Sequence, residues 1–120
     1  MTMEKRSWPV RLSAAAEGDY RDILRWTAAQ FGQAQARIYA KTISDALQAL
    51  SAGPDATHAK MRDDIMRGLL FLHVARAGRK GRHFILFRVG TRGKEKYVDV
   101  LRILHESMDF IRHLPPEEDV

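Results

Sequence analysis

The sequence predicts an α+β fold with an N-terminal strand, an antiparallel helical hairpin, an antiparallel β-meander and a short C-terminal helix. Three observations support it. A short segment of alternating character covers residues 8–12, helical periodicity follows over residues 14–52, and apolar strand-like segments lie between residues 68 and 104. The helices should cover one face of a small, twisted antiparallel sheet.

The length and composition of the chain fit one globular domain. The 120 residues match the commonest domain size, and 45% hydrophobic with 29% charged residues is an ordinary globular composition. We expect a single domain over residues 1–120, with a flexible leader at residues 1–7 and a mobile acidic tail at residues 115–120.

The first strand is short. Trp8, Val10 and Leu12 alternate with Pro9 and Arg11, which is the pattern of a half-buried strand. Proline has no N–H to donate to a ladder, so the strand should lie at a sheet edge or begin at the proline.

Two amphipathic helices are expected next, over residues 14–31 and 33–52. Ser13 is the expected N-cap of the first helix and Gly32 its stop. The apolar stripes consist of Ala16, Tyr20, Ile23, Leu24, Thr27 and Phe31 in the first helix and Ala36, Ala40, Ile43, Leu47 and Leu50 in the second. The short link predicts an antiparallel hairpin, in which the alanines of the second stripe allow close approach.

Residues 55–67 are expected to form a loop or a weak helical turn. The adjacent acids Asp63 and Asp64 lack a third ligand, so no metal site is predicted there, and nothing in the chain resembles a cofactor site.

Strands are predicted at residues 68–75, 83–89 and 97–104, joined by short loops into an antiparallel meander. The second connection is expected as a loop over residues 90–96. Ser107 is the expected cap of a last short helix that the following proline pair ends.

The formal net charge is +5, and basic residues concentrate between positions 76 and 96, where Glu95 is the only acid. This zone is formed by Arg76, Arg79, Lys80, Arg82, Arg88, Arg92, Lys94 and Lys96. It is suited to a phosphate backbone or an acidic protein partner, or it is a solubilising surface on the loops 76–82 and 92–96.

The absence of cysteine excludes disulfides, thiol catalysis and cysteine–zinc sites. No apolar stretch approaches the ~20 residues needed to cross a bilayer. We therefore expect a cytoplasmic protein that does not bind a membrane.

Arg102 and His105 are the candidate chemical groups of the last strand. Strict alternation places Val98, Val100, Arg102 and Leu104 on one face. An arginine in so apolar a strand needs a partner, either an acidic group of another protein or a local acid such as Asp109 or Glu106. His105 stands where the strand ends, a place suited to acid–base chemistry or to an ordinary surface role. No catalytic residue is predicted.

Several local strings resemble one protein family. They are FGQAQARIY at the helix junction, DIMRG before the second strand, GRHFILFRV, and VLRILHESMDFIRHLP near the end. Together they resemble the ParE branch of the RelE/ParE toxins of bacterial toxin–antitoxin pairs, from about Trp8 to Pro115.

The resemblance implies a RelE/ParE-like sandwich and a non-enzymatic toxin that inhibits DNA gyrase by protein binding. It implies a ParD-like antitoxin whose C-terminal segment wraps the helical hairpin and sheet, with operator DNA contacted only through the antitoxin. The family strings and the basic strands together assign the partner-binding positions Arg67, Arg82, Arg88, Arg102, His105, Asp109 and Arg112.

Two alternatives stay open. The RelE branch cuts messenger RNA on the ribosome with basic residues on its middle strands and a C-terminal Tyr or His. Here the strand near residues 69–74 is apolar, Phe84 stands where arginine is common, and the end RHLPPEEDV has no tyrosine. His105 and the candidate phosphate contacts Arg82, Arg88 and Arg102 keep an endoribonuclease as one alternative, and a degenerate toxin that only binds its antitoxin is the other.

Overall fold

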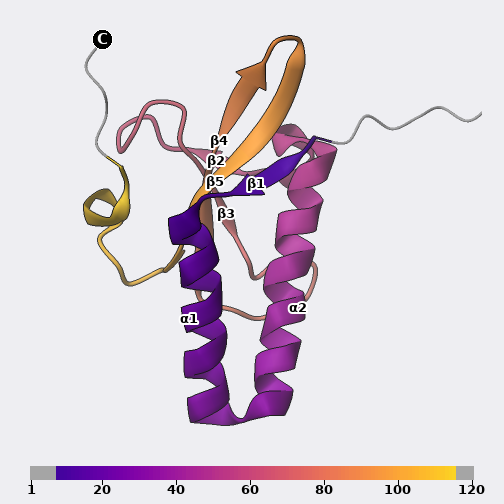
Figure 1. The fold of residues 1–120 in the computed structure, drawn as a ribbon, viewed down its shortest axis with the longest axis vertical. Coiled ribbons are helices and arrows are strands. Elements are labelled where there is room, and N and C mark those ends of the chain that lie inside the picture. Colours follow the sequence, from indigo (N-terminus) through magenta and orange to yellow (C-terminus); the bar gives the residue numbers. More distant parts are fainter. Residues whose placement is uncertain (1–7, 116–120) are drawn as a thin grey trace, which may run out of the picture.

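The computed structural model describes residues 8–115, except for the side chain of Ala56 (Figure 1). The predicted leader and all of the predicted tail after Pro115 lie outside the described residues. The elements in chain order are β1 (Val10–Leu12), α1 (Ala14–Phe31), α2 (Gln33–Ala49), η1 (Leu50–Ala52), η2 (Pro54–Thr57), β2 (Lys60–Met61), β3 (Leu70–His73), β4 (His83–Arg92), β5 (Glu95–His105) and η3 (Phe110–His113). The predicted α+β fold is confirmed.

The helical hairpin begins and ends as its capping residues dictate. The hydroxyl of Ser13 accepts the N–H of Ala16 at 3.0 Å and donates to the carbonyl of Leu101 at 2.8 Å, which fastens the start of α1 to β5. Gly32 ends α1 with a φ of +94°, which a side chain rarely adopts, and α2 starts at the next residue. The two helices therefore run antiparallel (Figure 1).

The sheet is mixed, with strand order β1-β5-β4-β3-β2. β1 occupies an edge, as Pro9 predicts, but pairs parallel to β5, so the fully antiparallel prediction is wrong at this strand. No tight turn joins β1 to β5, because every other strand and both long helices lie between them in the chain. The unpredicted β2 is a short exposed strand paired with β3.

The predicted loop at residues 90–96 is largely strand. β4 continues to Arg92, β5 begins at Glu95, and Gly93 makes the tight turn with a φ of +62°. Hydrophobic alternation missed these pairs because the hairpin projects past the rest of the sheet (Figure 1) and the side chains of residues 91–96 are exposed.

A bulge in β5 breaks its alternation. Leu86 pairs with Arg102 and Phe87 with Val100, which leaves Leu101 without a cross-strand partner. Beyond the bulge the faces exchange, so Ile103 joins Val100 in the core under the helices. The prediction that Arg102 and Leu104 share a face with Val98 and Val100 is therefore wrong.

Both faces of the sheet are covered. The core under the hairpin consists of Ala16, Ile43, Ala46, Leu50, Leu72, Val74, Ile85, Phe87, Val98, Val100 and Ile103. The core on the opposite face consists of Met66, Leu69, Phe71, Leu86, Leu101 and Leu104. Ile65, Phe84, Phe110 and Leu114 pack against this second core, so the segment before β3 and η3 cover the face that the helices leave open.

The last helix differs in detail from the prediction. η3 is a 3₁₀ helix whose N-cap is Asp109, so the prediction of Ser107 as the cap is wrong. The Ser107 hydroxyl lies 2.7 Å from Nδ1 of His105 instead. Within residues 8–115 no helix combines the length and apolarity that a bilayer crossing needs.

Candidate partner-binding surfaces

The predicted contact residues lie in separate parts of the molecule. Arg67 and Arg88 line one groove at the base of the β4–β5 hairpin. Arg82 and His105 belong to a polar cluster where β4 begins and β5 ends. Arg102, Asp109 and Arg112 lie at or near η3. The structure thus brings the predicted residues together in small groups and not in one site.

Arg102 pairs within the chain. Its Nε and Nη2 donate to the two carboxylate oxygens of Asp19 at 2.7 Å each, and its Nη1 donates to the carbonyl of His113 at 2.9 Å. The backbone N–H of Ile103 donates to the same carboxylate at 2.9 Å. This hydrogen bonding raises the pKa of the Arg102 guanidinium above its usual value.

The choice of Asp109 or Glu106 as the local acid for Arg102 is wrong. Asp19 lies 83 residues earlier, in α1, and no sequence pattern connects the two positions. Because all three guanidinium nitrogens have partners inside the chain, Arg102 joins α1, β5 and the end of η3. Its contact with another protein stays a prediction.

The exposed face of η3 carries both charge and apolar surface. Asp109 and Arg112 lie 3.9 Å apart and are open to solvent, and Ile111 between them is 64% exposed. A shallow depression of about 350 Å³ lies beside η3, lined by Ser13, Ala15, Leu101, Arg102, Arg112, His113, Leu114 and Pro115. This surface suits a mixed polar and apolar partner.

Glu106 is the centre of the polar cluster. One carboxylate oxygen lies 3.1 Å from Nε2 of His73, and the other accepts from Nη1 of Arg82 at 3.3 Å. The hydrogen bond from His73, more than the charge of Arg82, lowers the pKa of Glu106. Arg82 is therefore paired within the chain. Sequence reasoning offered Glu106 as a partner for Arg102 and not for His73 or Arg82, because the strand register that brings it to His73 is not visible in the sequence.

His83 is a half-buried member of this cluster. Its Nδ1 lies 2.6 Å from the Tyr39 hydroxyl, which accepts the backbone N–H of Arg82 at 3.2 Å. Burial, and then the nearby His105, lowers the pKa of His83 to about 4. His83 is therefore neutral near pH 7, and its contact with Tyr39 ties the start of β4 to α2.

His105 has few neighbouring groups that could assist it in acid–base catalysis. Its Nδ1 accepts the backbone N–H of Ser107 at 3.1 Å, and its ring lies 5.2 Å from that of His83. A neutral His83 can accept a proton but supplies no positive charge to a phosphate. In the described part of the chain, residues 8–115, no group of His, Asp or Glu side chains is arranged to hold a metal ion.

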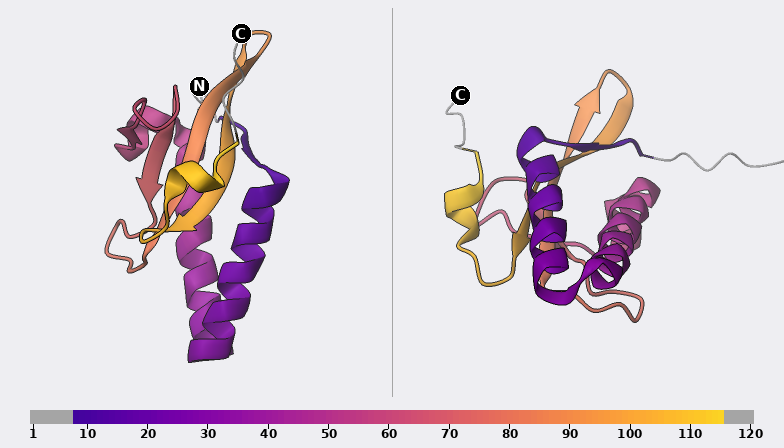
Figure 2. Two further views of the ribbon diagram at one scale, coloured as in Figure 1. Left: turned by 90° about the vertical axis from the view of Figure 1, so that its left-hand side faces the viewer. Right: turned by 60° about the horizontal axis from the view of Figure 1, so that its bottom comes forward.

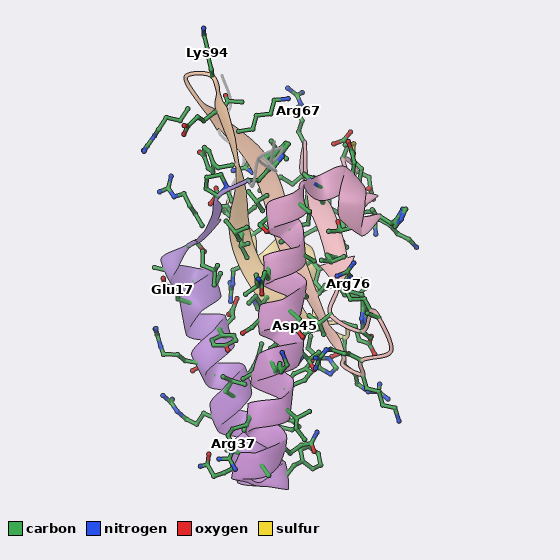
Figure 3. The ribbon with its side chains drawn as sticks, turned by 90° about the vertical axis from the view of Figure 1, so that its right-hand side faces the viewer. Glu17, Arg37, Asp45, Arg67, Arg76 and Lys94 are labelled. Carbon is green, nitrogen blue, oxygen red and sulfur yellow. The ribbon has the colours of Figure 1, made fainter. Side chains whose placement is uncertain are left out.

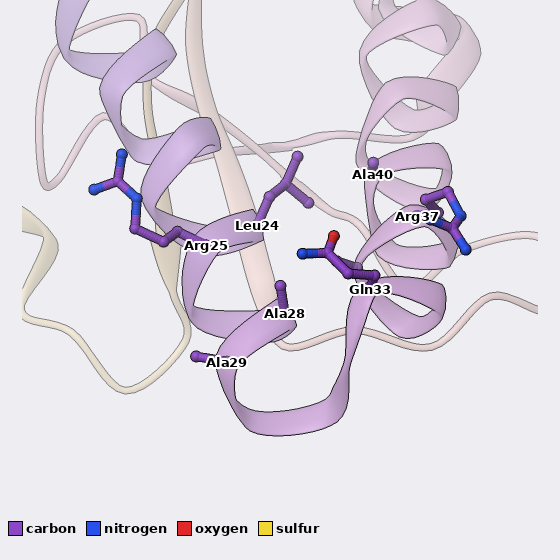
Figure 4. Close-up of a pocket in the computed structure, with 8 residues that line it drawn as sticks. Leu24, Arg25, Ala28, Ala29, Gln33, Arg37 and Ala40 are labelled. Atoms are coloured by element: carbon purple, nitrogen blue, oxygen red, sulfur yellow. The ribbon is translucent and has the colours of Figure 1, made fainter.

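A groove opens between the far ends of the two long helices, which extend beyond the strands (Figure 2). It has a volume of about 570 Å³ and is lined by Leu24, Arg25, Ala28, Ala29, Gln33, Ala36, Arg37 and Ala40. Figure 4 shows Leu24, Ala28 and Gln33 directed toward the space between the helices. Ala36 and Ala40, which were expected to allow close approach of the helices, are among the residues that line this groove.

Large apolar side chains stand exposed on the same end of the hairpin. Trp26 is 58% exposed, Phe31 65% and Ile38 56%, and the Trp26 and Phe31 rings meet edge to face at 5.9 Å. Exposed aromatic groups at an end of the molecule that also has an apolar groove are typical of a surface that another protein covers. The prediction that Phe31 shares the buried face of its helix is wrong, because the sheet does not reach so far.

A second groove lies at the base of the β4–β5 hairpin. It has a volume of about 310 Å³ and is lined by Arg67, Gly68, Arg88, Val89, Gly90, Tyr97 and Asp99. The Tyr97 ring lies so close over Gly90 that a Cβ there would collide with it. Figure 3 shows Lys94 at the hairpin tip and Arg67 beside the hairpin.

Comparison with known proteins gives consistent results. The family model described as the ParE toxin of the type II toxin–antitoxin system parDE matches residues 10–110. The chain is 28% identical to Toxin ParE1 of Caulobacter vibrioides over 106 residues, which cover 88% of this chain and 97% of that protein. Among solved structures, it is similar in fold to the chromosomal ParDE TA system from P. aeruginosa, with a TM-score of 0.66 at 17% identity, covering 83% of this chain and 97% of the other.

Proposed function

The chain belongs to the ParE toxin family of type II toxin–antitoxin systems, and from this premise we propose that it inhibits DNA gyrase by binding and is neutralised by a ParD-like antitoxin. The molecule acts through contact surfaces and not through bond breaking, and operator DNA is contacted only through the antitoxin. The proposed place of action is the cytoplasm.

The exposed apolar end of the helical hairpin is the observation that carries this proposal. A groove of about 570 Å³ lined mainly by Leu24 and alanines fits the apolar face of an amphipathic helix, and Trp26, Phe31 and Ile38 add exposed apolar surface at the same end of the hairpin. Arg25 and Arg37 on the groove walls fit acidic residues on the flanks of such a helix. An antitoxin that buries this surface would both stabilise the toxin and block its other contacts.

Expression and a supercoiling assay test the proposal. Expressed alone, the protein should arrest growth with filamentation and DNA-damage signalling, and the neighbouring gene's product should cancel the arrest. The purified protein should inhibit gyrase supercoiling. Absence of inhibition at micromolar toxin, with growth arrest retained, would reject gyrase as the target.

The antitoxin site has its own test. Ala40→Glu places a charge on the groove wall, so it should weaken antitoxin binding by about tenfold or more, since an unpaired charge is costly in an apolar contact. The matched control is Ser44→Glu, one helical turn along α2 at an exposed position outside the groove. Equal binding by both variants would place the antitoxin elsewhere.

A ribosome-dependent endoribonuclease is the second candidate, because His105, His83 and Arg82 lie together at one end of the sheet. It requires that His105→Ala abolish message cleavage on translating ribosomes while the protein stays folded. If the substituted protein arrests growth as well as the parent, this candidate fails. A toxin that is harmless when expressed alone would instead be the degenerate, antitoxin-binding form.

A further inference from the structure

The free edge of β4 lies beyond the point where β3 ends. β3 pairs with β4 only at Phe84–Phe87, whereas β4 continues through Arg92. No other strand in residues 8–115 pairs with the outer side of this extension. Its residues pair with β5 on one side and leave backbone groups available on the other.

The hydrogen-bond phase identifies which backbone groups are free. Val98 of β5 donates its N–H to the carbonyl of Pro9 at 2.8 Å, which is away from β4. Its cross-strand partner is Val89, so in this antiparallel ladder Val89 directs its own N–H and C=O to the outer edge. Thr91, two residues on, does the same. His83 lies an even number of residues before Val89, so its carbonyl points to the same side of β4. There it accepts the N–H of Val74 at 3.0 Å, which shows that this side faces away from β5.

The free edge has the residues of a strand that accepts a partner. Open edges in proteins are usually blocked by proline, a bulge or an inward charge. Here Val89 and Thr91 are good strand formers, and the bulge of the hairpin lies farther back, at Leu101. The groove of about 310 Å³ lies over the face of the hairpin that carries the cross-strand pairs Arg88–Asp99 and Gly90–Tyr97, next to this edge.

The charges around the edge select the partner. Arg88 and Arg92 project from the same face of β4, and Arg67 lines the groove beside them. Lys94 and Lys96 add positive charge at the tip, while Glu95 and Asp99 offset only part of it. A second copy of the chain would meet its own like charges here, whereas an acidic extended segment is complementary.

We propose that the outer edge of β4 at residues 88–92 binds an extended acidic segment of the antitoxin as an added strand. The backbone of Val89 and Thr91 supplies the strand hydrogen bonds, and Arg88 and Arg92 pair with carboxylates of the segment. The naming of the antitoxin as the source rests on the proposed function. The edge itself is tested with synthetic peptides, independently of growth arrest or gyrase inhibition.

The experiment uses the full chain and fluorescein-labelled peptides of about eight residues that alternate glutamate and threonine, long enough to cover the edge. The expected result is saturable binding, with amide NMR shifts and slowed exchange at Val89 and Thr91. A peptide that is N-methylated at alternate residues should bind at least about tenfold more weakly, because it cannot pair as a strand. A lysine–threonine peptide should not bind.

Protein variants separate backbone pairing from charge. Thr91→Pro removes one outer N–H without affecting the β4–β5 ladder and should weaken binding about fivefold, whereas Thr91→Val should not. Arg92→Glu should weaken binding by about tenfold, and the matched charge reversal Lys80→Glu on another loop should change it far less. Thermal unfolding of each variant checks that it folds.

Several outcomes would overturn the proposal. Binding that is indifferent to N-methylation and to Thr91→Pro would be charge attraction without strand addition. A labelled single-stranded oligonucleotide that binds the hairpin tip while the peptide does not would assign the basic surface to nucleic acid. The peptide could also shift the amides of Val89 and Thr91 only in a chain that ends at Pro115 and not in the full chain. That result would assign the edge to the chain's own residues 116–120.

Discussion

Asp19 accepts hydrogen bonds from two residues of β5. The Arg102 guanidinium contributes two of them and the backbone N–H of Ile103 contributes the third. The Asp19 and Arg102 side chains are only 13% and 23% exposed, so the pair is poorly screened by water. A charge that is left there without its partner is strongly unfavourable.

Asp19→Asn should therefore lower the free energy of unfolding by about 2–3 kcal/mol, because the amide cannot neutralise Arg102. Urea unfolding measures the change. The matched control is Asp22→Asn on the same helix, whose exposed pair with Arg25 should contribute less than about 0.5 kcal/mol. Equal effects of the two substitutions would show that the buried pair is not stabilising.

His83 makes stability depend on pH. Its pKa is about 4 in the folded chain against 6.5 for the free side chain, so the unfolded chain binds more protons between these values. Stability should be full above pH 6.5, fall as the pH drops toward 4, and change no further through this group below 4. Because the ring is partly open to solvent, we expect a loss of about 1–2 kcal/mol.

Unfolding measured from pH 7.5 to 4 tests this, with His83→Gln as the variant in which the fall becomes shallower. The pKa of Glu106 is lowered in the folded chain, so its protonation also reduces stability on acidification. The test is therefore the difference between the pH profiles of the parent and of His83→Gln. His58→Gln, at an exposed position, should keep the parent's profile. An unchanged profile in His83→Gln would contradict the assignment.

Among the elements, η3 shows how a short segment can complete a core. Phe110 contacts Phe71 at a centroid distance of 5.0 Å and Phe84 at 5.7 Å, over the face opposite the helices. Ile111, the next residue, points to solvent. Two consecutive residues of this 3₁₀ turn therefore face opposite ways, Phe110 toward the second core and Ile111 toward solvent.

Phe110→Ala should lower the free energy of unfolding by about 2 kcal/mol, because it uncovers the second core without removing a fully buried group. Ile111→Ala, the adjacent control, should stay within about 0.5 kcal/mol of the parent. Denaturant unfolding of both proteins makes the comparison. If the two losses are alike, η3 does not cover the sheet in solution.

On the scale of the whole molecule, the strands at the centre of the sheet are enclosed while two projections are not. Ile85, Phe87, Val98 and Val100 have no exposed surface. The far end of the helical hairpin and the tip of the β4–β5 hairpin extend from opposite ends of the molecule (Figure 1). A partner that covers both must run along the molecule, whose longest extent is 47 Å.

Hydrogen exchange should follow this arrangement. In the free protein, amides of the central strands should exchange only through global unfolding, whereas those around Gly32 and Gly93 should exchange through local opening. Adding the antitoxin should slow exchange at both projections. Protection confined to the central sheet would show that the partner covers neither projection.

The extent of sequence-based prediction differs between elements for physical reasons. Local signals predicted the caps of α1, because Ser13 and Gly32 act within one turn of the chain. They also predicted β1 at an edge, because a missing N–H is a property of Pro9 alone. The candidate contact residues were found by their charge or by family strings, but their grouping into separate surfaces was not foreseeable.

The sequence by itself determined the two long helices, the strands other than β2 and the family of this chain, since periodicity, capping and local strings are properties of neighbouring residues. Only the tertiary structure shows that Arg102 pairs with Asp19, that Leu101 forms a bulge in β5, and that the two long helices extend beyond the sheet. These features depend on register and on contacts between residues far apart in the chain. Such contacts carry no local pattern, because their energy exists only once both partners have been brought together.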